Sequence, residues 1–164
     1  MGGRRSARHA LANAGVAVAC AMFAATTPYP ALFTLAFAAA LATAAADTAG
    51  TEIGQLLGRR AFLLATLRQV QPGTPGAVSV EGTAAGVLAV AVVASLGVAV
   101  GLFGLKAGLV VVAAALAGTV VESLAGPTLE RRALLDHDAV NFLNTLVGAL
   151  GAAALSPLVV GGLS

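Results

Sequence analysis

Residues 9–46 read HALANAGVAVACAMFAATTPYPALFTLAFAAALATAAA and contain no Asp, Glu, Lys or Arg. A helix that spans a bilayer needs about 20 apolar residues, so this run is too long for one span and long enough for two. The segment Pro28-Tyr29-Pro30 interrupts it, because proline fixes φ and lacks a backbone donor. The stretch therefore predicts two membrane helices joined by a tight turn.

Three further stretches lack the same charged residues: 82–105, 107–121 and 139–164. The whole pattern predicts an all-α fold, a polytopic membrane helical bundle with about five transmembrane helices in a single integral membrane domain over residues 1–164. We expect a cytoplasmic loop over 58–80. The helices are expected at about 10–27, 31–57, 81–103, 105–126 and 138–161.

The composition supports a bilayer as the natural solvent. Of 164 residues, 59% are hydrophobic and 10% are charged, and the mean hydropathy is +0.94. Soluble domains have about 45–50% apolar and about 25% charged residues. These values exclude disorder, a nucleic-acid-binding tail and most soluble folds. With Cys20 as the single cysteine, neither an intrachain disulfide nor a zinc cluster can form.

The basic residues predict an orientation. With the N-terminus in the cytoplasm, the inside segments hold eight of the nine basic residues, and the outside turns hold only Lys106. We therefore expect the N-terminus and any functional site on the cytoplasmic side. The apolar run after the first arginines continues past the length of a signal peptide, which indicates a retained anchor. The inside residues are Arg4, Arg5, Arg8, Arg59, Arg60, Arg68, Arg131 and Arg132.

The acidic residues are the most informative positions in so apolar a chain. A charge at the bilayer centre costs roughly 2.5–3.5 kcal/mol, so acids within the membrane usually pair, line a cavity or bind a ligand. Asp47 and Glu122 are expected to lie deepest, whereas Glu130 is interpreted as a solvated interfacial charge. The full set is Asp47, Glu52, Glu81, Glu122, Glu130, Asp136 and Asp138.

Two segments around residues 47–83 carry small residues in patterns with more than one explanation. Gly50, Gly54 and Gly58 recur every four residues, which lets another backbone or a flat ligand approach closely. Residues 68–83 are rich in Gly and Pro and predict a loop. That loop is either a plain surface loop or an anion-binding nest, and it is not a P-loop, because no Gly-Lys-Ser/Thr motif occurs.

The last two predicted helices add further polar groups. Residues 118–126 place small and polar side chains along one helical face around Glu122. Asp138 is either a ligand-binding residue or the N-cap of the last helix, and Asn141 continues its face into the bundle. His9 and His137 are expected at the membrane interface and not as metal ligands.

These segments are predicted to converge on one cytoplasmic pocket. Carboxylates with nearby arginines suit a Mg²⁺–phosphate ligand, because Mg²⁺ is commonly held by one or two carboxylates together with phosphate oxygens. A bilayer environment suits a substrate with a hydrocarbon tail. The combination favours transfer of a phosphate-bearing group to or from a lipid.

Four ordered motifs resemble the domain-of-unknown-function 92 (DUF92) integral membrane family, over roughly residues 8–151. Its members include the plant phytyl-phosphate kinase of vitamin E synthesis and carry additional N-terminal membrane helices, whereas this chain begins close to the shared core. A more distant similarity extends to CTP-dependent lipid enzymes, namely phytol kinase, dolichol kinase and CDP-diacylglycerol synthase. The motifs lie at 46–58, 72–86, 122–126 and 138–141.

The resemblance implies a CTP-dependent kinase that converts an isoprenyl monophosphate, such as phytyl or geranylgeranyl phosphate, to the diphosphate with Mg²⁺ as cofactor. The residues assigned to catalysis on this basis are Asp47, Glu81, Arg59 and Arg68. Those assigned to substrate binding are Gly73, Thr74, Gly76, Ser79 and Asn141. Those assigned to the metal are Asp47, Asp138 and Glu122, with Glu81 as a further candidate.

Two other classes of function fit the same residues. Acids within a glycine-rich bundle also suit a transporter or channel for protons or cations, although no inverted repeat is evident. A non-catalytic membrane partner subunit is the third interpretation. For all three interpretations, the glycine faces of the helices are compatible with a homodimer.

Overall fold

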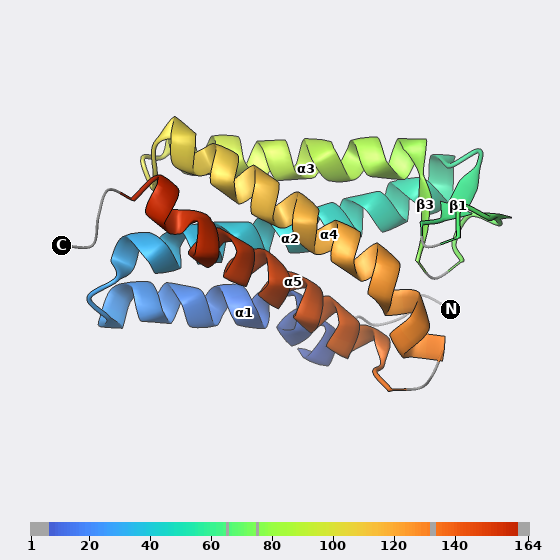
Figure 1. Cartoon of the computed structure of the whole chain (residues 1–164), viewed down its shortest axis with the longest axis horizontal. Helices are drawn as coiled ribbons and strands as arrows, with labels where there is room; N and C mark the ends of the chain where they lie inside the picture. Colours follow the sequence, from blue (N-terminus) through green and yellow to red (C-terminus); the bar gives the residue numbers. More distant parts are fainter. Residues whose placement is uncertain (1–6, 65, 75, 132–133, 161–164) are drawn as a thin grey trace.

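The structure is a computed structural model, and it describes residues 7–64, 66–74, 76–131 and 134–160 (Figure 1). Arg4, Arg5 and Arg132, which belong to the predicted inside set, lie outside the described residues. The elements are five α-helices, three short strands and a final 3-10 turn. The helices are α1 (Ala7–Thr26), α2 (Pro30–Leu57), α3 (Val80–Ala99), α4 (Leu105–Arg131) and α5 (His137–Leu155).

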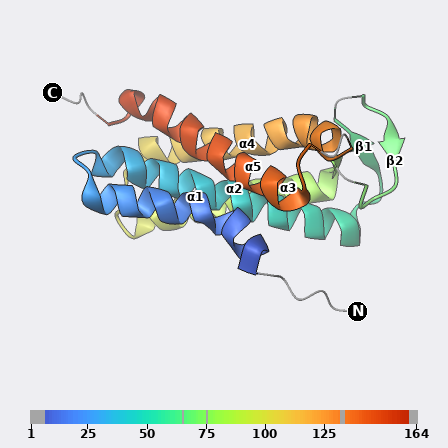
Figure 2. The same ribbon diagram turned by 90° about the horizontal axis from the view of Figure 1, so that it is seen from below.

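All five helices are long and apolar enough to cross a bilayer, which confirms the predicted class of fold. The bundle is built around α2, which contacts each of the other four helices. The last helix, α5, begins at the end of the bundle that carries the sheet and ends at the opposite one (Figures 1 and 2). The α1–α2 turn and the α3–α4 turn lie at the end of the bundle opposite the sheet (Figure 1). Successive helices therefore cross the bundle in alternating directions.

The ends of α3, α4 and α5 differ from the predicted boundaries, and α5 ends at Leu155 and not near 161. α3 ends at Ala99 and not near 103, because Gly101 adopts φ +75° in the turn that follows. α4 continues through Pro127 to Arg131 and does not stop at 126. Proline at this position leaves the Ser123 carbonyl without its usual helical donor, a loss that membrane helices tolerate when neighbours compensate.

The predicted loop over 58–80 contains a small antiparallel sheet at the same end of the bundle as the N-terminus (Figure 1). The strand order is β2-β1-β3, and Ala61 pairs with both Val70 and Ser79. Ala61 is buried. The sheet therefore ties the loop to the helix ends. The strands are β1 (Ala61–Leu63), β2 (Gln69–Val70) and β3 (Ala77–Ser79).

The core is packed with small side chains, so the helices approach closely. Ala39, Ala42 and Ala115 are fully buried around Val90 and Val111. At the α2–α3 contact, a Cβ added to Gly82 would lie 2.5 Å from the Gly50 carbonyl oxygen and 3.0 Å from the Gly54 Cα. The glycines of α2 thus face the α3 backbone and are not a free surface for dimerisation.

Candidate functional site

A pocket of about 440 Å³ lies where the sheet meets the ends of α2, α3, α4 and α5. We call it the central pocket. Its lining combines polar side chains with apolar ones from the sheet segment and from all four helices. The polar lining includes Asp47, Thr51, Gln55, Thr74, Ser79, Thr83, Thr119, Glu122, Ser123 and His137.

Two carboxyl groups face each other in this pocket. Asp47 is on α2 and Glu122 is on α4, and they are close enough to share a hydrogen bond. Thr51 lies one turn after Asp47 and donates its hydroxyl to the Asp47 carboxylate at 3.5 Å. Two acids in contact must share a proton or bind a cation, because two adjacent negative charges repel strongly in a medium of low polarity.

Asn144 positions the second of these acids. Its Nδ2 donates to Glu122 Oε2 at 2.5 Å, from a side chain that is only 3% exposed. Sequence reasoning missed this residue. The spacing of Asn144, three residues after Asn141, places both amides on one face of the helix. The sequence does not show that this face packs against α4 at Glu122.

The glycine-containing loop forms the outer wall of the pocket. Gly73 and Gly76 both have positive φ, at +87° and +71°. A Cβ at Gly76 would overlap the ring of Pro127, so the loop rests directly on α4. Thr74 lies between the two glycines, donates its backbone N–H to Gln71 and accepts one from Ala77. The three predicted phosphate-binding residues therefore do line the pocket with the carboxylates.

Ser79 and Glu81 have local roles at the start of α3. Ser79 is the N-cap, and its Oγ accepts the backbone N–H of Gly82 at 3.1 Å. Glu81 lies in the first turn, where a negative charge is favoured by the helix dipole. Ser79 also lines the pocket, whereas Glu81 is absent from its lining.

Three other predicted site residues lie outside the lining of the central pocket. Arg59 and Arg68 are exposed on the segments that flank β1 and β2. Asn141 is 2% exposed within the bundle, and its Oδ1 has no hydrogen-bond partner among the described residues. The structure thus places both arginines at exposed positions outside the pocket lining.

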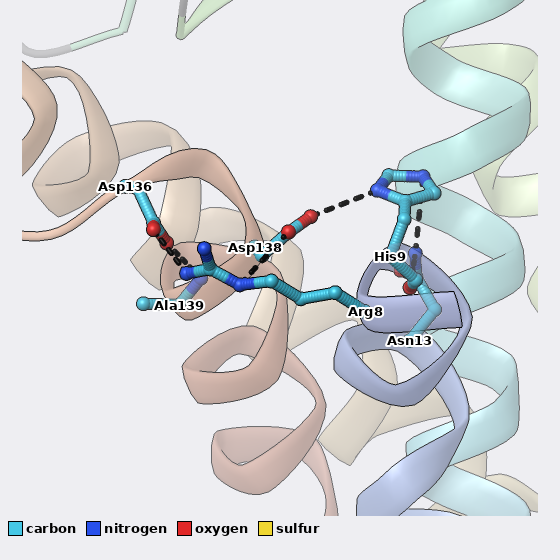
Figure 3. Close-up of polar contacts among 6 residues, drawn as sticks. All are labelled: Arg8, His9, Asn13, Asp136, Asp138 and Ala139. Carbon is cyan, nitrogen blue, oxygen red and sulfur yellow. Dashed lines mark hydrogen bonds and ion pairs between the residues drawn. The ribbon is translucent and has the colours of Figure 1, made fainter. Parts of the chain in front are cut away.

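Asp138 belongs to a separate polar cluster that joins α1 to α5 (Figure 3). Its carboxylate lies 3.3 Å from Arg8 Nε and 3.0 Å from His9 Nδ1. Arg8 also pairs with Asp136. Neighbouring residues of a helix point about 100° apart, so His137 faces the central pocket while Asp138 faces α1.

The predicted metal set is therefore only partly assembled. Asp47 and Glu122 meet, and Asp138 lies elsewhere. Within the described ranges, no three His, Cys, Asp or Glu side chains form a group that could hold a metal ion by themselves.

The N-cap of α5 is Asp136, so the alternative interpretation of Asp138 as the cap is wrong. Asp136 Oδ1 accepts the Ala139 backbone N–H at 2.9 Å. This hydrogen bond, together with the Arg8 guanidinium, lowers the pKa of Asp136 below its ordinary value. Capping fixes where the chain enters α5 and so sets the direction of the two residues that follow.

A second cavity, the α1–α5 groove, is wider and almost entirely apolar. Its volume is about 810 Å³, and aromatic rings of Phe23, Phe33 and Phe142 line it. Arg8 and Asp138 lie at its polar end. His9 contacts Asp138 and stacks on His137, with ring centroids 6.1 Å apart. The stacked histidines and the Asp138 contacts therefore lie between the groove and the central pocket.

The geometry defines a polytopic helical membrane protein with a carboxylate-lined pocket at one end of the bundle. The sequence profile described as "Integral membrane protein DUF92" matches residues 1–149, and the chain belongs to this family.

Curated relatives agree with that assignment. An uncharacterised membrane protein of Synechocystis sp. is 38% identical over 90% of this chain and 58% of its own length. The chloroplastic protein VTE6 of Arabidopsis thaliana is 30% identical over 96% of this chain and 50% of its own length. An uncharacterised membrane protein of Methanocaldococcus jannaschii is 33% identical over 89% and 60%. The chain thus spans about half to three fifths of these relatives, and no solved structure matches it.

Proposed function

We propose that the central pocket is the phosphoryl-transfer site of a CTP-dependent kinase that converts an isoprenyl monophosphate to the diphosphate. The observation that supports this is the meeting of Asp47 and Glu122 beneath the Gly73–Gly76 loop at one end of a membrane bundle. The nucleotide and the isoprenyl group come from the family resemblance. Phytyl and geranylgeranyl phosphate are the substrates it implies.

The proposed reaction needs no general base in the protein. A phosphate monoester has its second pKa near 6, so its oxygen is already deprotonated at neutral pH. That oxygen attacks the γ-phosphorus of CTP, the bond from the γ-phosphorus to the β–γ bridging oxygen breaks, and CDP leaves. Such transfers depend mainly on positioning and on neutralising charge. This fits a pocket whose described lining holds carboxylates and backbone donors.

The donor set fits Mg²⁺ provided that phosphate oxygens complete the coordination. Asp47 and Glu122 would hold the ion, since Mg²⁺ is usually bound by one or two carboxylates plus substrate phosphates. When bound, the ion supplies charge neutralisation for the phosphates. The two acids would repel a phosphate in its absence, so metal and nucleotide are expected to bind together.

The chain's own residues would orient the substrates around that ion. Gly73 and Gly76, which have positive φ, would contact phosphate through their backbone N–H groups. Thr74 would shape the loop between them, because its backbone N–H and its hydroxyl are both donated to the Gln71 carbonyl. Thr51 and Asn144 would hold the two carboxylates in place. Arg59 and Arg68 would meet phosphate charge at the outer edge of the pocket, on the cytoplasmic side.

The test uses the purified chain in nanodiscs with γ-³²P-CTP, Mg²⁺ and phytyl phosphate, with a longer family member assayed in parallel. We expect labelled phytyl diphosphate, and a loss of at least about 100-fold in kcat for Asp47→Asn and Glu122→Gln. Glu52→Gln is the matched control, because Glu52 is an exposed acid of α2 outside the pocket lining. Absence of product while the longer member is active would overturn the proposal for this chain.

A further inference from the structure

We propose that the hydrocarbon tail of the lipid substrate leaves the central pocket sideways, between α3 and α4, and not through the larger α1–α5 groove. This inference rests on the proposed function, because it takes the phosphate end of the lipid to lie at Asp47 and Glu122. It assigns a tail-binding role to Val87, Leu116 and Val120, which are apolar residues of the pocket lining on α3 and α4.

The first step in the argument is the direction of the pocket. Leu116 lies six residues before Glu122 on α4, which is about 9 Å along the helix at 1.5 Å per residue. Val87 lies two turns past the Ser79 cap on α3. The lining therefore extends past the carboxylates toward the middle of the bundle as far as Leu116. Val87 lies level with Asp47, because Gly86 packs against Ala46.

The second step is that two of these apolar residues also reach the outer surface of the bundle. Val87 is 44% exposed and Val120 is 48% exposed, although both line the pocket. In a bilayer their exposed surfaces face hydrocarbon. α3 and α4 also diverge toward the sheet end, with α4 crossing in front of α2 (Figure 1). The two valines thus line the pocket and also meet the lipid, so the proposed exit for the tail lies between them.

The third step is volume. Ligand pockets commonly measure about 300–1,000 Å³, so a cavity of about 440 Å³ is small for a nucleotide and a lipid together. The reacting phosphates occupy it, and most of the tail must extend outside. An exit to the bilayer between Val87 and Val120 lets that tail stay in hydrocarbon throughout the reaction, at no cost in exposed apolar area.

The wider groove is a weaker route, in spite of its size. A tail that reached it from Asp47 would have to cross the His9–His137 stack and the Asp138 contacts. Those groups are polar and paired, and separating them would leave Asp138 without Arg8 and His9. Breaking charged contacts to admit an apolar chain is unfavourable, whereas the proposed exit between α3 and α4 already presents valine.

Photolabelling locates the tail without relying on turnover. The probe is an isoprenyl monophosphate with a diazirine on its terminal unit, bound to the chain in nanodiscs with Mg²⁺ and CDP. We expect label on peptides of α3 and α4 around Val87 and Val120, displaced by phytyl phosphate but not by phytol. Displaceable label on α1 and α5 would overturn the inference in favour of the groove. Label that phytyl phosphate does not displace would also overturn it.

Tryptophan substitution gives an independent measurement. Val87→Trp and Val120→Trp should raise KM for phytyl phosphate about tenfold and leave kcat/KM for the short, soluble dimethylallyl phosphate within about twofold. Leu88→Trp and Leu124→Trp are matched controls, because they are exposed on the same helices outside the lining. An equal effect on both substrates, or a selective effect of Leu143→Trp in the groove, contradicts the route.

The two proposals fail in different ways. If α3 and α4 are labelled displaceably but no diphosphate product forms, the proposed lipid site stands and the proposed kinase activity is contradicted. If Val87→Trp and Val120→Trp leave the kinase activity on both substrates unchanged, the proposed reaction stands and the proposed exit for the tail is contradicted.

Discussion

Asn144 links the polar pocket to the buried face of α5, and its single hydrogen bond to Glu122 can be tested directly. We expect Asn144→Leu to lower the free energy of unfolding by about 1–3 kcal/mol, because Glu122 loses a donor in a partly buried site. In a double-mutant cycle with Glu122→Gln, measured by unfolding in detergent, the coupling should be about 0.6–1.7 kcal/mol.

The matched control is Asn141→Leu, which removes a buried amide from the same helix one turn away. Its coupling to Glu122→Gln should be near zero. Equal coupling energies for Asn141 and Asn144 would mean that the effect is general loosening of α5 and not the hydrogen bond.

Gly76 tests the contact between the loop and α4. Gly76→Ala combines an unfavourable positive φ, worth about 1–2 kcal/mol, with overlap against Pro127. We expect faster proteolysis of the 66–74 segment and weaker nucleotide binding. Gly101→Ala is the control, because its φ is +75° and an added Cβ meets nothing within 4 Å. If the two variants are cleaved at the same rate, the loop does not depend on Pro127.

At the scale of elements, the junction of α1 and α5 predicts a response to acid. Asp136 has a pKa below its ordinary value of 3.8, because it accepts the Ala139 N–H and pairs with Arg8. Its contribution to stability is therefore fully present above that ordinary value. It is lost as the pH falls through the lower folded-state pKa.

The measurement is thermal unfolding in nanodiscs from about pH 6 to below pH 3.8, the ordinary value from which this contribution begins to fall. Asp136→Asn retains a capping oxygen but cannot change charge, so its melting temperature should fall less on acidification than that of the wild type. Superimposable pH profiles for the two proteins would show that Asp136 does not link α1 to α5.

The elements themselves differ in how far the sequence determines them. Apolar length predicts all five helices, since a bilayer leaves the backbone few other ways to satisfy its hydrogen bonds. The strands at 61–63, 69–70 and 77–79 have two or three residues each, too few to show a period of two. Pro127 wrongly suggests that α4 ends before it. The helix continues through this proline, which packs against Gly76.

At the scale of the whole molecule, the sequence predicts which polar residues share one end of the bundle but not which of them meet. Asp47, Glu122 and the loop converge, as the clustering of polar groups at one end indicates. Asp138 does not join them, because α5 packs with Asp138 turned toward Arg8 and His9 of α1. Rotation about a helix axis depends on packing, which spacing within one sequence does not contain.

The same asymmetry of charge predicts how the bundle lies in the membrane. Arg8, Arg59, Arg60 and Arg68 belong to the end that carries the sheet, and Lys106 begins α4 at the other end. Basic residues are retained on the cytoplasmic side of a membrane, so their excess at the sheet end favours that end inside. We therefore expect the central pocket to open to the cytoplasm.

Cysteine labelling tests this orientation, since replacing Cys20 by serine removes the single native thiol. Leu102→Cys places a thiol in the α3–α4 turn, and Gln69→Cys places one on β2; both positions are exposed. A membrane-impermeant maleimide should label Leu102→Cys in intact cells and Gln69→Cys only after permeabilisation. Equal labelling of both in detergent is the control for reactivity. The reverse pattern in intact cells would place the pocket outside the cytoplasm, where CTP is not supplied, and would contradict the kinase together with the orientation.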